Sequence, residues 1–191
     1  MLLVVEYRPN EQTMDVMMEQ FLLLAKYNRW MNQSIYKTCL AMGQDNVDKN
    51  QDSFFPSISK TLNHLLLGDL VWLYRCSGDK GVMKFVDGDG HDFKIKSLNQ
   101  VVFSKLEELW EKRQGIDNDI VKYVESLNAD QVNESVEYRS TDGCLHTKDL
   151  GTILTHWFNH QTHHRGQITA LIHQQGYEFG TTDLILIENE F

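Results

Sequence analysis

The chain has 191 residues, of which 41% are hydrophobic, 10% aromatic and 24% charged, and its formal net charge is −9. This composition argues against a disordered chain and predicts a single domain over residues 1–191 with a substantial core. The acidic excess, without any dense cluster of Lys and Arg, argues against nucleic acid as a partner. No apolar run is long enough to span a membrane, and no secretion signal is recognisable, so we expect a cytoplasmic protein without membrane contact.

Apolar side chains in the first part of the chain recur at three- and four-residue steps, which is typical of amphipathic helices. The first predicted helix covers residues 11–42, and a polar segment, 43–53, follows it. The second begins after Pro56, is capped by Ser57 and runs from 58 to 76. This second helix is apolar on nearly all sides, so we expect it at the centre of the core.

The middle of the chain predicts an irregular connection and then a third helix. Residues 77–96 are rich in Gly and Asp and show no hydrophobic period, which is typical of a loop. From Ser97, as a cap, to Leu127 the helical period returns, with a charged outer face.

The last third of the chain predicts a hairpin followed by a fourth helix. Alternating apolar residues over 132–146, with Asp-Gly in the middle, indicate two short strands. The last helix is expected from about Thr147, as a cap, to Gln175, with Gly176 ending it. Four long helices and one hairpin therefore predict an all-α four-helix bundle, and the long connections permit a topology other than simple up-down-up-down.

Four of the eight histidines fall within nine residues of the last predicted helix, namely His156, His160, His163 and His164. At about 100° per residue, His164 falls inside the apolar arc of the helix and His160 lies near its edge, while the other two point further round. Because residues four apart lie one turn above each other, His160 and His164 could reach one metal ion. The same spacing also occurs in hydrogen-bonded core histidines and in exposed polar stripes, so both interpretations stay open.

A metal site of this kind needs a third ligand from another helix. A zinc protease is disfavoured because Gln161 follows His160 where that motif requires Glu. His64 is the best candidate for the third ligand, because the second predicted helix is too apolar for an unpartnered imidazole. The histidines expected at the surface are His91, His146, His163 and His173.

Three segments resemble the signature helices of one known family, the DinB family of DinB/YfiT-like metalloenzymes. They are YNRWMN at 27–32, NHLLLGD at 63–69 and NHQTHHRGQ at 159–167. The order of helices, irregular loop and hairpin agrees, so the resemblance covers nearly the whole chain. It implies a four-helix bundle of up-down-down-up topology, often dimeric, that holds one divalent metal ion with three histidines.

By matching position, the metal ligands that this resemblance implies are His64, His160 and His164. Imidazole suits zinc or nickel, and three neutral ligands would leave the ion its full charge and open positions. Such an ion could generate a thiolate or a hydroxide at neutral pH. The superfamily includes enzymes that use low-molecular-weight thiols, namely mycothiol-dependent maleylpyruvate isomerase and bacillithiol or mycothiol S-transferases, while many members have no established reaction.

Three functions are therefore compatible with the sequence. The first is a metal-dependent enzyme that activates a low-molecular-weight thiol for S-transfer to a small electrophile. The second is a metal-dependent hydrolase of a small substrate, and the third is a non-catalytic metal-binding stress-response protein. We expect a small-molecule substrate and, from the resemblance, a homodimer.

Residues beside the implied ligands are expected to support the site. Asn63 and Gln167 could orient ligands through hydrogen bonds. Asp69 lies one turn beyond His64, and we expect it to pair with Arg165, which could alternatively bind an anionic substrate or thiol. Gly166 is expected to allow close approach of two helices. The tryptophans expected in the core are Trp30, Trp72 and Trp157.

Overall fold

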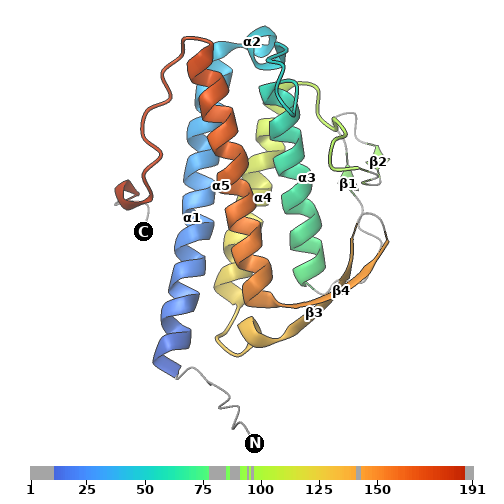
Figure 1. The fold of residues 1–191 in the computed structure, drawn as a ribbon, viewed down its shortest axis with the longest axis vertical. Helices are drawn as coiled ribbons and strands as arrows, with labels where there is room; N and C mark the ends of the chain where they lie inside the picture. The colour runs from blue at the N-terminus through green and yellow to red at the C-terminus, as the bar shows by residue number, and fades with distance from the viewer. Residues whose placement is uncertain are drawn as a thin grey trace, which may run out of the picture.

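The computed structural model describes residues 11–77, 85–86, 91–93, 95, 97–140 and 143–187. Its main feature is a bundle of four long helices (Figure 1), of which α1 and α5 run in one direction and α3 and α4 in the other. The predicted four-helix bundle of up-down-down-up topology is therefore confirmed. The long helices are α1 (Glu11–Met42), α3 (Ile58–Ser77), α4 (Leu106–Ser126) and α5 (Leu150–Gln174). The shorter elements are α2 (Gln44–Asp48), β1 (Phe85–Val86), β2 (Asp92–Phe93), β3 (Ser135–Arg139), β4 (Leu145–Asp149), η1 (Gln131–Asn133) and η2 (Leu184–Leu186).

The first two predicted helices agree closely with α1 and α3. The short helix α2 lies within the polar segment 43–53, and Gly43, with a φ of 82°, makes the turn that precedes it. In α3, the residues on all sides are buried only as far as Leu70, and residues 71–76 are half-buried. The expectation of a fully central helix therefore holds for the first two thirds of α3.

The predicted start of the third long helix is wrong, because α4 begins at Leu106 and not at Ser97. The side chain of Asn63 accepts hydrogen bonds from the backbone N–H groups of Val102 and Phe103, at 2.9 and 3.0 Å. It also donates to the carbonyl oxygen of Phe103 at 3.0 Å. These backbone groups are therefore bonded to α3, and the segment before Leu106 is an irregular connection and not part of the helix.

The hairpin before the last helix is confirmed, but the last helix starts later than predicted. Strands β3 and β4 pair antiparallel, from Ser135 opposite Asp149 to Arg139 opposite Leu145. Thr147 lies in β4, and the cap of α5 is Asp149, whose carboxylate accepts from the backbone N–H of Thr152 at 2.7 Å. The Asp of the predicted Asp-Gly turn lies outside the described residues.

Two other expectations concern the end of α5 and the connection that follows α3. Gly176 has a φ of 83° directly after α5, as predicted for a residue that ends a helix. Part of the connection that was expected to be irregular forms strands β1 and β2, which pair antiparallel, and the remainder of 78–96 lies almost entirely outside the described residues. None of the helices in the described part of the chain is long and apolar enough to cross a membrane.

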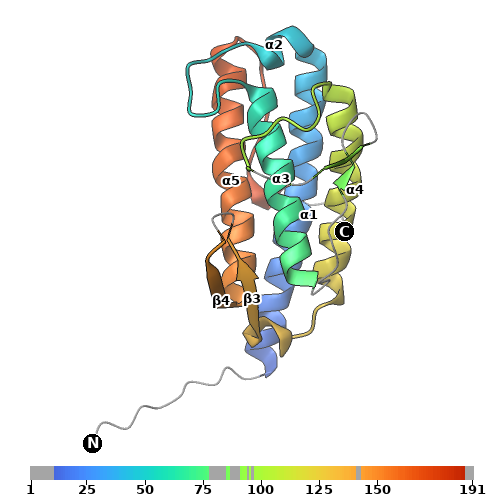
Figure 2. The same ribbon diagram turned by 90° about the vertical axis from the view of Figure 1, so that its right-hand side faces the viewer.

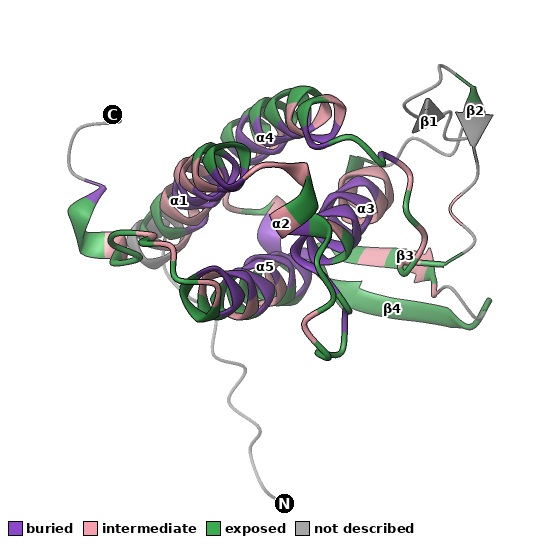
Figure 3. Ribbon diagram, turned by 90° about the horizontal axis from the view of Figure 1, so that it is seen from above, coloured by how far each residue is buried: buried purple, intermediate pink, exposed green. Residues whose placement is uncertain are grey.

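The core lies along the axis of the bundle, where all four long helices present buried residues to one another (Figure 3). The hairpin lies outside this core, beside the ends of α3 and α5 (Figure 2). Trp157 is fully buried, as expected, whereas Trp30 and Trp72 are only half-buried. Apolar residues that are at most 1% exposed include Ala25, Ile35, Cys39, Ile58, Leu66, Leu109, Ile120, Leu154, Trp157 and Ile168.

Gly151, in the first turn of α5, tests the packing between this helix and η1. A Cβ atom at Gly151 would lie 2.7 Å from Cγ1 of Val132, a stiff and buried side chain. We therefore expect Gly151→Ala to lower the free energy of unfolding by about 1–3 kcal/mol. Gly115→Ala is the matched control, because its Cβ would meet nothing within 4 Å and should stabilise α4 by about 0.5–1 kcal/mol. Urea unfolding followed by circular dichroism checks both values, and equal effects would contradict the packing.

Candidate metal centre

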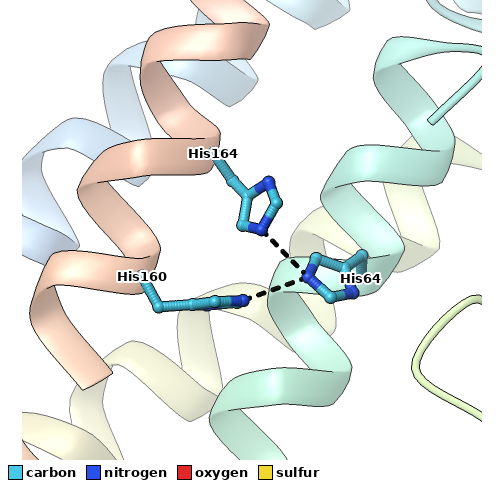
Figure 4. Close-up of side chains that lie close together, drawn as sticks. All are labelled: His64, His160 and His164. Carbon is cyan, nitrogen blue, oxygen red and sulfur yellow. Dashed lines mark hydrogen bonds between the residues drawn. The ribbon is translucent and has the colours of Figure 1, made fainter. Parts of the chain in front are cut away.

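Three histidine side chains from two helices meet between α3 and α5. His64 comes from α3, and His160 and His164 come from successive turns of α5 (Figure 4). The Nε2 atom of His64 lies 3.1 Å from Nε2 of His160 and 3.2 Å from Nε2 of His164. All three ligand atoms lie within 4.8 Å of one another, so the cluster could hold a metal ion. Two nitrogen atoms bound to one tetrahedral ion at about 2.0–2.1 Å are themselves about 3.3 Å apart.

The hydrogen bonds of the outer ring nitrogens fit a metal at the inner ones. Nδ1 of His64 donates to the carbonyl oxygen of Leu98 at 3.1 Å, and Nδ1 of His164 donates to Oε1 of Gln167 at 2.7 Å. A neutral imidazole carries only one proton, so the Nε2 atoms of both rings are bare and their lone pairs face each other. A bound cation would turn this repulsion into attraction, and the outer hydrogen bonds would orient the ligands.

The protonation states of the three rings also favour metal binding. Burial lowers the pKa of His64 and of His164. Burial, together with the neighbouring His164 and His64, lowers the pKa of His160 to about 3. All three imidazoles are therefore neutral at pH 7, which is the form that binds metal ions.

Phe55 covers one side of the cluster, although the sequence analysis did not single it out. Its ring stacks on His64 with centroids 4.4 Å apart and meets His164 edge-on at 5.5 Å. Only 6% of Phe55 is exposed. An aromatic residue next to Pro56 in a polar segment was the one signal for this contact. Behind it lies a cavity of about 190 Å³, lined by Ser53, Phe54, Phe55, Thr61, Gln167, Ala170 and Leu171.

The close approach of α3 and α5 occurs at a different glycine from the predicted one. A Cβ atom at Gly166 would meet nothing within 4 Å, so the expectation for Gly166 is wrong. At Gly68, one turn beyond His64, a Cβ atom would lie 3.5 Å from Cε1 of His160. That distance is an ordinary van der Waals contact, so the imidazole of His160 packs against α3 at Gly68 without requiring a glycine there.

The carboxylate of Asp69 has other partners than the predicted Arg165. Its Oδ2 forms an ion pair with Nη1 of Arg113 on α4, at 2.7 Å, and both side chains are at most 1% exposed. Its Oδ1 accepts from the indole N–H of Trp157 at 2.5 Å and from the amide of Gln161. Arg113 stands directly against the carboxylate, and this is why the expected pair with Arg165 does not form.

Arg165 is buried and binds the first helix of the bundle. It donates to Oδ1 of Asn28 on α1 and, at 3.1 Å, to the hydroxyl of Thr162. Its guanidinium lies 5.4 Å from the centre of the Tyr27 ring. Burial lowers the pKa of Arg165 to about 10, so the group remains charged at pH 7. Tyr27 and Asn28, from the first family-like segment, thus have a structural role in holding α5.

The charged network continues from Arg113 to α1. Nη2 of Arg113 contacts Oδ1 of Asp117 at 2.9 Å, and Asn32 donates to the same oxygen at 2.9 Å. Burial raises the pKa of Asp69 and raises that of Asp117 to about 7, while Arg113 opposes both shifts. Two aspartates and two arginines, counting Arg165, balance in formal charge. The network joins all four long helices.

The remaining histidines lie at the surface as predicted. The exposed ones are His91, His146, His156, His163 and His173. Helix periodicity and the family resemblance thus separated the three clustered histidines from the rest, and Asn63 and Gln167 were expected in their surroundings. Arg113 and Trp157 carried no motif that could reveal their contacts with Asp69, because those contacts join different helices.

The fold and the cluster together define a class, a helical-bundle protein with a three-histidine site that could hold a metal ion. The chain belongs to the DinB family, whose model matches residues 17–190. Family membership and the histidine cluster fit a metal-binding protein.

Two comparisons with individual proteins agree with the family. The chain is 27% identical over 160 residues to Protein DinB of Bacillus subtilis (strain 168). The matched region covers 84% of this chain and 88% of that protein. The crystal structure of a DinB-like protein from Bacillus cereus ATCC 10987 superposes with a TM-score of 0.61 at 16% identity. That match covers 85% of this chain and 95% of the other, and it supports the fold.

Asp69→Asn tests whether the buried ion pair maintains the bundle. The variant keeps the shape of the side chain but removes its charge, which leaves Arg113 buried with only one carboxylate. We expect the free energy of unfolding to fall by about 3–5 kcal/mol, as when one partner of a buried pair is removed. The control is Asp119→Asn on the exposed face of α4, with an expected change within about 0.5 kcal/mol. Urea unfolding measures both, and a loss below about 1 kcal/mol at Asp69 would refute the assigned role.

Proposed function

We propose that this protein binds one divalent ion, zinc or nickel, through Nε2 of His64, His160 and His164, and that it transfers a low-molecular-weight thiol to a small electrophile. The observation that carries the proposal is the meeting of three neutral imidazoles, in which Nε2 of His160 and Nε2 of His164 lie 3.1 and 3.2 Å from Nε2 of His64. The substrate is proposed to be a small molecule and the protein a homodimer, as the family resemblance implies.

The chemistry follows from the charge of the ligand set. Three neutral ligands leave the charge of a divalent ion uncompensated, and a thiol bound there would lose its proton more readily at pH 7. The histidines are proposed to hold the ion to which the sulfur binds, while Phe55 keeps water from one side of that sulfur. In the transfer, the sulfur forms a bond to the electrophilic carbon, the leaving group departs with its electron pair, and the thiol proton passes to solvent.

Two amides are proposed to position the ligands. Gln167 holds the ring of His164 directly. Asn63 acts at a distance, because it binds the backbone at Val102 and Phe103 and thereby fixes the chain that carries the Leu98 carbonyl. Asp69 is proposed to act only through the packing of α5, since its oxygens are occupied by Arg113, Trp157 and Gln161. That carboxylate is therefore not available as a general base.

Metal content tests the ligand set. We expect purified wild-type protein to hold one zinc or nickel ion per chain after dialysis, and His64→Ala, His160→Ala and His164→Ala proteins to be substoichiometric. His163→Ala is the matched control, because His163 lies on the same helix but is exposed, and it should retain the ion. Elemental analysis gives the stoichiometry and circular dichroism confirms the fold. Full occupancy in all three folded variants would exclude this ligand set.

Turnover of a chromogenic chloronitrobenzene, with and without added thiols, tests the reaction. We expect chloride release and a thioether product only when both metal and thiol are present. Hydrolysis of ester or amide substrates without thiol would instead favour the hydrolase alternative. Metal-loaded protein that turns over neither class of substrate would favour the non-catalytic alternative.

A further inference from the structure

A row of aromatic side chains leads away from the histidine cluster toward the hairpin. The ring of His156 lies 6.0 Å from that of His160 and meets Trp72 edge-on at 5.4 Å. Trp72 in turn meets Tyr138 of β3 edge-on at 5.2 Å. Figure 2 shows the hairpin beside the lower ends of α3 and α5. Because His160 and Trp72 are half-buried and His156 is exposed, the row is accessible to solvent.

Arg75 lies at the far end of this row. Its guanidinium carbon is 4.8 Å from the centre of the Trp72 ring and 4.9 Å from that of Tyr138. One Nη atom donates to the carbonyl oxygen of Arg139 at 2.6 Å. These contacts hold the guanidinium in one position and leave most of its five donor hydrogens uncommitted.

The charge of Arg75 has no counterpart in the described part of the chain. Arg113, by contrast, contacts two carboxylates. Arg75 is half-buried, and burial lowers its pKa, which is a cost that a bound anion would offset. A fixed, partly desolvated guanidinium packed against two aromatic rings can bind a carboxylate through two parallel hydrogen bonds.

The distance between this site and the histidine cluster sets the length of a ligand that reaches both. Trp72, beside which the guanidinium lies, is eight residues beyond His64 on α3, which corresponds to about 12 Å along the helix. The ligand must therefore be an extended molecule with sulfur at one end and an anion at the other. Between them it would run past the rings of His156 and Trp72.

We propose that Arg75, with Trp72 and Tyr138, binds the carboxylate of an extended anionic thiol whose sulfur reaches the three-histidine cluster. The inference rests on the proposed function, and it adds the class of thiol. Arg75 selects long, carboxylate-bearing thiols over neutral ones of the same length. The aromatic row contacts the middle of the thiol molecule and does not select for a chemical group there.

A series of straight-chain thiols of different lengths and end groups tests this proposal. Zinc-loaded protein is titrated calorimetrically with mercaptocarboxylic acids of three and of eight to eleven carbons, and with mercaptoalcohols of equal lengths. We expect the long acid to bind about tenfold more tightly than the long alcohol, and the two short compounds to bind equally. Equal affinities of the long acid and the long alcohol would overturn the proposal.

Variants of Arg75 test whether this residue causes the tighter binding of the long acid, which is called the gain below. Arg75→Met keeps an unbranched side chain against the two rings, and we expect it to bind the long acid no better than the long alcohol. Arg75→Lys should retain part of the gain, and it keeps the test valid if Arg75→Met does not fold. Arg29→Met is the control, because Arg29 contacts Asn118 between α1 and α4, and it should retain the whole gain. An unchanged gain in folded Arg75→Met protein would contradict the assignment.

A separate measurement distinguishes failure of this inference from failure of the proposed function. In cobalt-substituted protein, sulfur-to-metal charge-transfer absorption reports thiol ligation whether or not a carboxylate binds at Arg75. If no thiol of any length produces this absorption, the proposed function fails and the inference fails with it. If short and long thiols both produce it while acid and alcohol bind equally, only the inference about Arg75 fails.

Discussion

A single buried carboxylate, Asp69, determines how α3 meets the rest of the bundle. Its charge is compensated by Arg113 on α4, and its second oxygen accepts from Trp157 and Gln161 on α5. Gln161 directly follows His160 in the chain, so the hydrogen bond that satisfies Asp69 also sets the rotation of α5 about its axis. The position of the histidine cluster is thus a consequence of satisfying one buried charge.

The network around Asp69 contributes more to the arrangement of helices than to stability. A buried ion pair recovers through its mutual attraction little more than the desolvation of its two charges costs. Any other rotation of α5 would leave Arg165 without Asn28, and Asp69 without Trp157 and Gln161, at a cost of several kcal/mol. Alternative packings of four similar amphipathic helices are therefore disfavoured, and we infer that the polar layer through Asn28, Asn32 and Asp117 specifies one of them.

Local patterns were sufficient to predict the helices, and long-range contacts account for what they missed. Periodicity predicted α1 and α3 and placed His160 and His164 toward the bundle, because these features depend on residues three and four apart. The start of α4 could not be predicted, because Asn63, about forty residues earlier, takes the backbone hydrogen bonds of Val102 and Phe103. The partner of Asp69 was missed for the same reason, since four-residue spacing cannot choose between arginines on two other helices.

The surroundings of the cluster differ on its two sides, and this difference gives the site a direction. Toward α2, Phe55 stacks on His64 and only 6% of it is exposed, so that side is apolar. Toward the hairpin, the half-buried His160 is followed by the exposed His156 and by Trp72, so that side is open to solvent. The proposed thiol would approach the cluster from this hairpin side. Arg75, on the same side, is held by two aromatic rings and not by a carboxylate in the described part of the chain. In this proposal, the hairpin forms one wall of the approach to the histidines.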